Sequence, residues 1–123
     1  MSAPNPQACA RADLVARRAG LLIWGVPLAL IAIGFAWPTA RAVLWVLAFT
    51  VAGAGCVLNA RRCGRTHCHV TGPLYLGLAA VSALMGFGAL DWGWQFVGIA
   101  AAVGTAIAFV PELIGPRYLR KSR

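Results

Sequence analysis

The sequence predicts an all-α integral membrane protein, a four-helix bundle formed by two antiparallel hairpins with both termini in the cytoplasm. Composition, four long apolar segments and the distribution of basic residues predict this fold. Of the 123 residues, 60% are hydrophobic and 11% are charged, whereas a soluble domain has roughly 45–50% apolar residues. A compact globule of this length could not hide so many apolar side chains from water. We therefore expect the solvent around most of the chain to be lipid.

Four apolar segments are long enough to cross a membrane as helices. They are residues 20–37, 42–58, 74–90 and 95–115. A helix rises about 1.5 Å per residue, so roughly 17–25 residues cross a hydrocarbon core of about 30 Å. The segments lack the alternation that is typical of barrel strands. Arg17 and Arg18 precede the first segment as they would a cleavable signal peptide, but this run is long for one and ends in Trp37-Pro38.

The basic residues predict the orientation of these spans. Ten of the eleven fall in the N-terminal arm (1–19), the connection 59–73 and the tail (116–123), against one, Arg41, in the first connection. Because cytoplasmic flanks retain Lys and Arg, these three regions are expected on the inner side of a bacterial inner (plasma) membrane. Topology thus explains the net charge of +8 without a nucleic-acid partner. The arm is expected to contain a short interfacial helix.

Short turns and small residues predict how the helices pack. The connections 38–41 and 91–94 each have four residues, so each should join an antiparallel hairpin. Ala48, Ala52 and Cys56 recur at four-residue spacing, which is typical of close helix packing in lipid. Such seams could lie within one chain, between copies in a homo-oligomer, or against a partner subunit.

The connection 59–73, which we expect to be a long cytoplasmic loop, contains most of the groups suited to chemistry. The candidate metal ligands are Cys63, Cys68, His67, His69 and, one turn before the loop, Cys56. Disulfides are rare in the cytoplasm, so metal binding or redox chemistry is expected ahead of a structural bridge. Thiolates with imidazole favour soft ions, here Hg(II), Cu(I) or Zn(II).

The charge around these thiols favours their reactive form. Arg61, Arg62 and Arg65 lie among them, and basic neighbours stabilise thiolates. The positive end of the third helix, which Thr71 could cap and Pro73 could begin, should add to this effect. The alternative is a basic loop in which the cysteines and histidines are incidental.

Glu112 is an acidic residue close to the end of the fourth apolar segment. It could carry protons or bind a hard metal ion, or it could pair with Arg117 or Arg120 and reach the membrane surface. The sequence has no Ser–His–Asp arrangement, no glycine-rich phosphate loop and no pair of intramembrane acids. We therefore expect a protein that is not an enzyme, with a thiol-redox membrane enzyme as an alternative.

The segment 62–68, RCGRTHC, followed by Thr71-Gly72-Pro73, resembles a loop signature, R-C-G-R-x-H-C-x-x-T-G-P, of small bacterial four-helix inner-membrane proteins. This resemblance implies the fold and the location, and no activity. In size and in its cytoplasm-facing cysteines, the chain is also similar to small mercuric transport proteins. Those proteins place a cysteine pair in the first membrane helix, whereas residues 21–37 contain no cysteine, so this similarity is one of architecture.

The function expected from these observations is the binding of a soft heavy-metal ion by the Cys/His loop, in metal transport or handling. The first alternative is a non-catalytic membrane subunit or scaffold that binds no metal.

Overall fold

The computed structural model describes Gln7, Arg11 and residues 18–115, and these residues form helices joined by short connections. The helices are α2 (Arg18–Ala36), α3 (Arg41–Cys63), α4 (Thr66–Gly86) and α5 (Trp94–Ile114). No strand occurs in the described residues, which confirms the all-helical prediction. The tail 116–123 lies outside the described residues. Of the N-terminal arm, where a short interfacial helix is expected, residues 1–17 are described only at Gln7 and Arg11, which are both helical.

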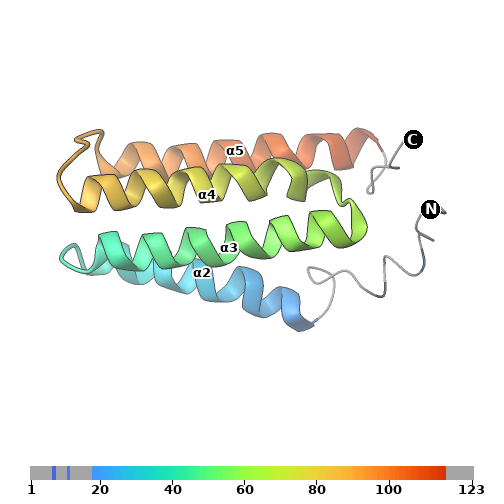
Figure 1. Cartoon of the computed structure of the whole chain (residues 1–123), viewed down its shortest axis with the longest axis horizontal. Coiled ribbons are helices and arrows are strands. Elements are labelled where there is room, and N and C mark those ends of the chain that lie inside the picture. The colour runs from blue at the N-terminus through green and yellow to red at the C-terminus, as the bar shows by residue number, and fades with distance from the viewer. Residues whose placement is uncertain (1–6, 8–10, 12–17, 116–123) are drawn as a thin grey trace.

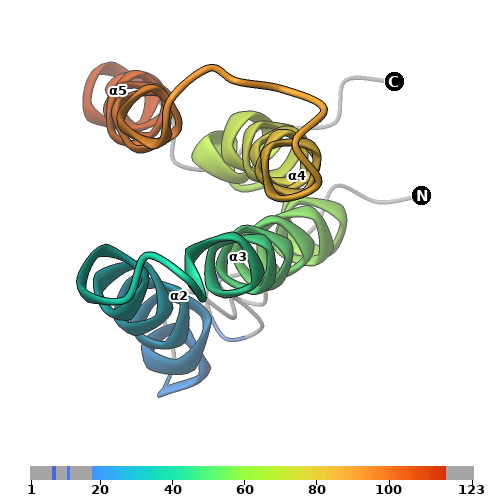
Figure 2. The ribbon, with the colours of Figure 1, turned by 90° about the vertical axis from the view of Figure 1, so that its left-hand side faces the viewer.

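The four helices lie lengthwise beside one another (Figure 1). The α2–α3 and α4–α5 connections lie at one end, and the α3–α4 connection lies at the other. Close backbone contacts join α2 to α3, α3 to α4 and α4 to α5. Within residues 18–115 the backbones of α2 and α5 stay farther apart, and these two helices meet through side chains such as Trp24 and Phe109. Seen end-on, the row of helices curves back on itself (Figure 2).

The open side between α2 and α5 contains an apolar groove of about 370 Å³. Its walls come from α2 and α5, and its floor from α3 and α4. Trp24, Phe49, Tyr75 and Thr105 are among the lining residues. The groove therefore ends against aromatic side chains that also belong to the core between the helices.

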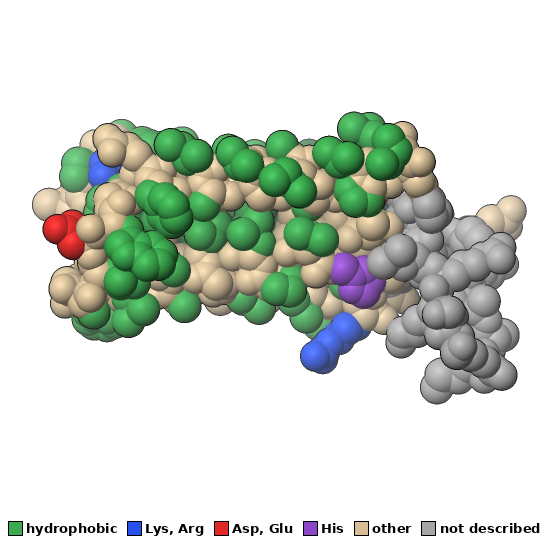
Figure 3. Space-filling model, turned by 90° about the horizontal axis from the view of Figure 1, so that it is seen from above, with side chains coloured by type: hydrophobic (Ala, Val, Ile, Leu, Met, Phe, Trp, Pro, Cys, Tyr) green, Lys and Arg blue, Asp and Glu red, His purple; other side chains and the backbone are tan. Residues whose placement is uncertain are grey.

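Three of the helices are long and apolar enough to cross a membrane. The candidate spans are Arg41–Arg62, Thr66–Gly86 and Trp94–Ile114, and the apolar part of α2, Gly20–Ala36, is shorter. On the side shown in Figure 3, hydrophobic side chains cover the length of the molecule, and charged side chains appear only toward its ends. This distribution is that of a protein whose middle faces hydrocarbon.

Trp45 joins α2 to α3 at the end of the molecule where the first connection lies. Its indole N–H donates to the carbonyl of Ile31 at 3.2 Å, and its ring packs edge-on against Phe35 and Trp94. Arg41 donates from Nε to the carbonyl of Gly34 at 2.9 Å. The Arg41 bond satisfies a carbonyl in the last turn of α2 that no later residue of that helix reaches.

The small-residue seam on α3 is confirmed within the chain. Ala48, Ala52 and Cys56 are all buried, and α3 packs most extensively against α4. Small side chains let two helix backbones approach closely where lipid provides no hydrophobic driving force. Cys56, the last residue of this seam, is also one of the candidate metal ligands.

The expectation of a long loop over residues 59–73 is wrong. Helix α3 continues through Cys63, helix α4 begins at Thr66, and only Gly64 and Arg65 lie between them. Gly64 has φ 64° and donates its N–H to the carbonyl of Ala60 at 2.8 Å. A glycine in the left-handed conformation ends one helix and lets the next begin at once. The polar residues of segment 59–73 therefore lie mostly at the end of α3 and the start of α4, and they do not form a long loop.

Two residues expected at the start of α4 lie inside it. Thr71 does not cap the helix, because it is buried and donates its hydroxyl to the carbonyl of His67 at 2.9 Å. Pro73 is also within the helix. Membrane helices tolerate internal proline because nearby groups such as Ser and Thr hydroxyls satisfy the freed backbone.

Candidate metal centre

Two thiols and one imidazole meet between α3 and α4. Cys56 belongs to α3, and His67 and Cys68 belong to the first turn of α4. All three side chains are fully buried, with 0% exposure. Each offers one donor atom, and these three atoms lie within 4.8 Å of one another. The set of two sulfurs and one nitrogen is one that soft metal ions prefer.

The local sequence explains why these donors meet. The two-residue connection Gly64–Arg65 turns the chain back on itself, so the end of α3 lies beside the start of α4. At Gly72 the helices approach so closely that an added Cβ would lie 2.7 Å from Cγ2 of Val57. Val57 follows Cys56 directly, and Gly72 is one turn beyond Cys68. The close approach therefore brings the two sulfurs together.

The two ring nitrogens of His67 have different partners. Nδ1 lies 2.6 Å from Oε1 of Glu112, and Nε2 lies 3.4 Å from Sγ of Cys68. A histidine between a carboxylate and a thiol in this way resembles the arrangement around metal-ligating histidines, in which the second ring nitrogen bonds to a carboxylate. The imidazole thus has one nitrogen toward the thiols and one toward α5.

Glu112 connects α5 to the start of α4. Its Oε1 accepts hydrogen bonds from Nε of Arg65 and from the backbone N–H of His67, both at 3.3 Å. Its described partners are therefore Arg65 and His67, and the expected partners Arg117 and Arg120 lie outside the described residues. Glu112 is not one of the three clustered donors; it contacts the centre through His67.

Aromatic and polar side chains close the centre. Phe109 stacks on the His67 ring with a centroid distance of 4.3 Å and an interplanar angle of 18°, and Trp24 lies 6.3 Å away between ring centroids. Asn59 is fully buried and donates from Nδ2 to Sγ of Cys68 at 3.6 Å. The donors are thus shielded from water, and one sulfur accepts a hydrogen bond from an amide.

The five ligands predicted from the sequence are placed differently by the structure. Cys56, His67 and Cys68 come together. His69 is exposed and lies outside the cluster, because residues two apart on a helix point to nearly opposite sides. Cys63 is the last residue of α3, and its side chain is outside the described part, so its role as a ligand stays a prediction.

Sequence reasoning did not assign Asn59, Phe109 or Trp24 to the site. Helical spacing on α3 was a signal for Asn59, because residues 56 and 59 share a face of a continuous helix. No local signal exists for Trp24 and Phe109, which reach the site from α2 and α5.

Comparison with protein-family models, curated proteins and solved structures finds no match to this chain.

Proposed function

We propose that this protein binds a soft metal ion at Cys56, His67 and Cys68 and takes part in the transport or handling of that ion. The observation that carries the proposal is the convergence of three fully buried donor atoms within 4.8 Å. Soft thiolate ligands favour Cu(I) and Zn(II), and by the same argument Hg(II). A hard ion such as Mg²⁺ would require oxygen ligands.

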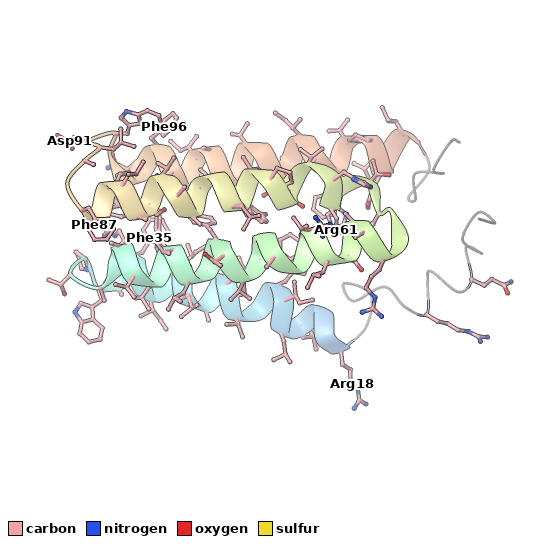
Figure 4. The ribbon with its side chains drawn as sticks, viewed as in Figure 1. Arg18, Phe35, Arg61, Phe87, Asp91 and Phe96 are labelled. Carbon is pink, nitrogen blue, oxygen red and sulfur yellow. The ribbon has the colours of Figure 1, made fainter. Side chains whose placement is uncertain are left out.

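The proposed setting is a bacterial inner membrane crossed by all four helices as two antiparallel hairpins, with both termini in the cytoplasm. Arg18 and Arg61 lie toward the end of the molecule that has the α3–α4 connection, and Asp91 lies toward the other end (Figure 4). Because basic residues are retained on the cytoplasmic side, the metal centre would face the cytoplasm. Cysteine substitutions at Arg61 and Asp91, which are exposed, labelled in intact cells with an impermeant thiol reagent, test this orientation: only the second should react.

Metal titration of the reduced, detergent-purified protein tests the binding proposal. We expect tight binding of Zn(II) or Cu(I) with one ion per chain, and its loss in Cys56→Ser and Cys68→Ser. Cys9→Ser, which changes a cysteine outside the clustered donors, is the matched control and should bind as the wild type does. Tight binding that persists when both Cys56 and Cys68 are serine would contradict the proposal. Cys63→Ser shows separately whether that residue is a further ligand.

A thiol-redox function is the second candidate, favoured by the two neighbouring sulfurs of Cys56 and Cys68. In this case the two thiols would lose two protons and two electrons to an added disulfide such as oxidised glutathione, and one disulfide would form. Mass spectrometry of the intact protein after such treatment distinguishes the candidates. A reversible loss of two hydrogens by a chain that retains no metal favours the redox function.

A homo-oligomer or a membrane partner subunit is a further proposal, which also covers the scaffold alternative. The apolar groove between α2 and α5 is consistent with packing against another membrane helix. Light scattering of the protein–detergent complex measures whether one chain or several are present.

A further inference from the structure

We infer that Glu112 is a positioning residue of the metal centre, whose carboxylate fixes the His67 imidazole so that Nε2 is the nitrogen offered to the ion. The inference rests on the proposed metal-binding function and adds the role of a residue from α5. Glu112 acts through His67 and is not itself a ligand, since it lies outside the donor cluster.

The surroundings of the His67 imidazole determine which of its nitrogens carries the proton. In a neutral imidazole one nitrogen carries the proton and the other has the lone pair that binds a metal. Nδ1 lies 2.6 Å from Oε1 of Glu112, and a carboxylate can only accept there. The proton therefore belongs on Nδ1, which leaves the lone pair of Nε2 directed toward Cys68, whose Sγ is 3.4 Å away.

Residues of α5 restrain the position of the His67 ring. His67 is fully buried, and its backbone N–H donates to the same oxygen of Glu112 that its ring contacts. Phe109, one turn before Glu112 on α5, stacks on the ring at 4.3 Å. Backbone, ring edge and ring face of His67 are thus all held by residues of α5. A ring turned by 180° about the Cβ–Cγ bond would keep the stacking contact but would place a carbon atom, and not Nδ1, against the carboxylate.

Glu112 has a largely buried carboxylate that is paired with Arg65. Its side chain is 8% exposed and that of Arg65 is 11% exposed. A carboxylate this far from water is costly unless it is paired, and Nε of Arg65 lies 3.3 Å from it. Arg65 therefore keeps the carboxylate charged and available to His67. A charged acceptor gives the stronger hydrogen bond to Nδ1–H.

The test compares the purified Glu112→Ala and Glu112→Gln variants with the wild type and with Leu113→Ala. Leu113 is the neighbour of Glu112 and is 83% exposed, so it is the matched control. Zn(II) affinity is measured by competition with a chelator, and Co(II) absorption reports the ligands and their geometry. Loss of a hydrogen-bond partner of a metal-bound histidine typically lowers affinity about 10- to 100-fold.

We expect Glu112→Ala to show such a loss with an altered Co(II) spectrum, while Leu113→Ala leaves both unchanged. Glu112→Gln should recover most of the affinity and the wild-type spectrum, because its amide oxygen still accepts from Nδ1–H. If Glu112 acts through His67, a Glu112→Ala/His67→Ala double variant should bind no more weakly than His67→Ala.

Wild-type affinity and spectrum in Glu112→Ala would overturn the inference, and so would additive losses in the double variant. Neither result would affect the proposed function if Cys56→Ser and Cys68→Ser still abolish binding. Binding that survives both cysteine substitutions would remove the proposed function itself. If Glu112→Ala fails to fold, Glu112→Leu, which fills a similar volume without a hydrogen-bond acceptor, takes its place, and wild-type affinity and spectrum in that variant overturn the inference.

Discussion

Gly72 of α4 lies so close to Val57 of α3 that a Cβ added at Gly72 would be 2.7 Å from Cγ2 and 3.3 Å from the backbone nitrogen of Val57. A contact with backbone cannot be relieved by turning a side chain. Because Val57 follows Cys56, the distance between the two helices at this point also sets the distance between the thiols of Cys56 and Cys68. The absence of a side chain at residue 72 is therefore part of the construction of the site.

Gly72→Ala should lower the free energy of unfolding by about 1–3 kcal/mol, the usual cost of overpacking, and should weaken metal binding by separating α3 from α4. Gly77→Ala is the matched control on the same helix, since nothing lies within 4 Å of a Cβ added there. Denaturation in detergent and metal titration measure the two effects. Equal stability and affinity in the two variants would show that the helices adjust at Gly72 without cost.

Burial of Cys56 and Cys68 predicts slow reaction with thiol reagents. In a Cys9→Ser/Cys63→Ser background, these are the two remaining cysteines, and both have 0% exposure. We expect a polar maleimide to label the folded protein at least tenfold more slowly than the denatured protein, because reaction requires local opening. Mass spectrometry over time measures the rates. Rapid labelling of the folded chain would mean that the sulfurs are open to water.

Substitution of Ser82 is expected to stabilise the protein. It is fully buried on α4, and its hydroxyl has no hydrogen-bond partner among the described residues. An unsatisfied buried hydroxyl is costly, so Ser82→Ala should raise the free energy of unfolding by about 1 kcal/mol. Metal affinity should not change, since Ser82 is four turns from Cys68 along the helix. A lower free energy of unfolding in Ser82→Ala than in the wild type would indicate that the hydroxyl has a partner in the membrane.

The sequence predicted that its apolar segments are helical, because apolar runs of sufficient length have few other solutions in lipid, but it ended the second helix at residue 58 and began the third at residue 74, whereas α3 runs to Cys63 and α4 starts at Thr66. Its five predicted ligands include all three clustered donors of the described residues, because His67 and Cys68 are neighbours and Cys56 is one turn before the expected loop. The loop itself was wrong because one glycine, Gly64, ends α3 and allows α4 to follow at once. Composition does not show this, since arginine and cysteine occur equally well in loops and helix ends.

The separation of His69 from the site follows from the same misjudged loop. In a flexible segment His67 and His69 could both turn toward one ion, whereas on a helix they diverge. The contact between Glu112 and His67 joins residues 45 positions apart, and it depends on how α5 packs against α4. No periodicity within either helix indicates which acidic and imidazole groups will meet.

The hydrogen bond between Tyr75 and Thr105 has a direction that yields the last prediction. Their oxygens are 2.5 Å apart, and the hydroxyl of Thr105 also donates to the carbonyl of Ala101 at 2.6 Å. A hydroxyl has one proton to donate, so Tyr75 must be the donor and Thr105 the acceptor. The two substitutions that break this α4–α5 bond should therefore have unequal costs.

Tyr75→Phe leaves Thr105 bonded to Ala101 and should cost about 0.5–1 kcal/mol in unfolding free energy. Thr105→Val leaves the hydroxyl of Tyr75, a residue only 5% exposed, without its acceptor, and should cost about 1–3 kcal/mol. In Thr105→Val, the further change Tyr75→Phe should then recover part of the stability, because it removes the stranded donor. A double-mutant cycle measured by denaturation in detergent gives this coupling. Equal single costs that simply add would mean that Thr105 donates to Tyr75 or that water reaches the pair through the groove.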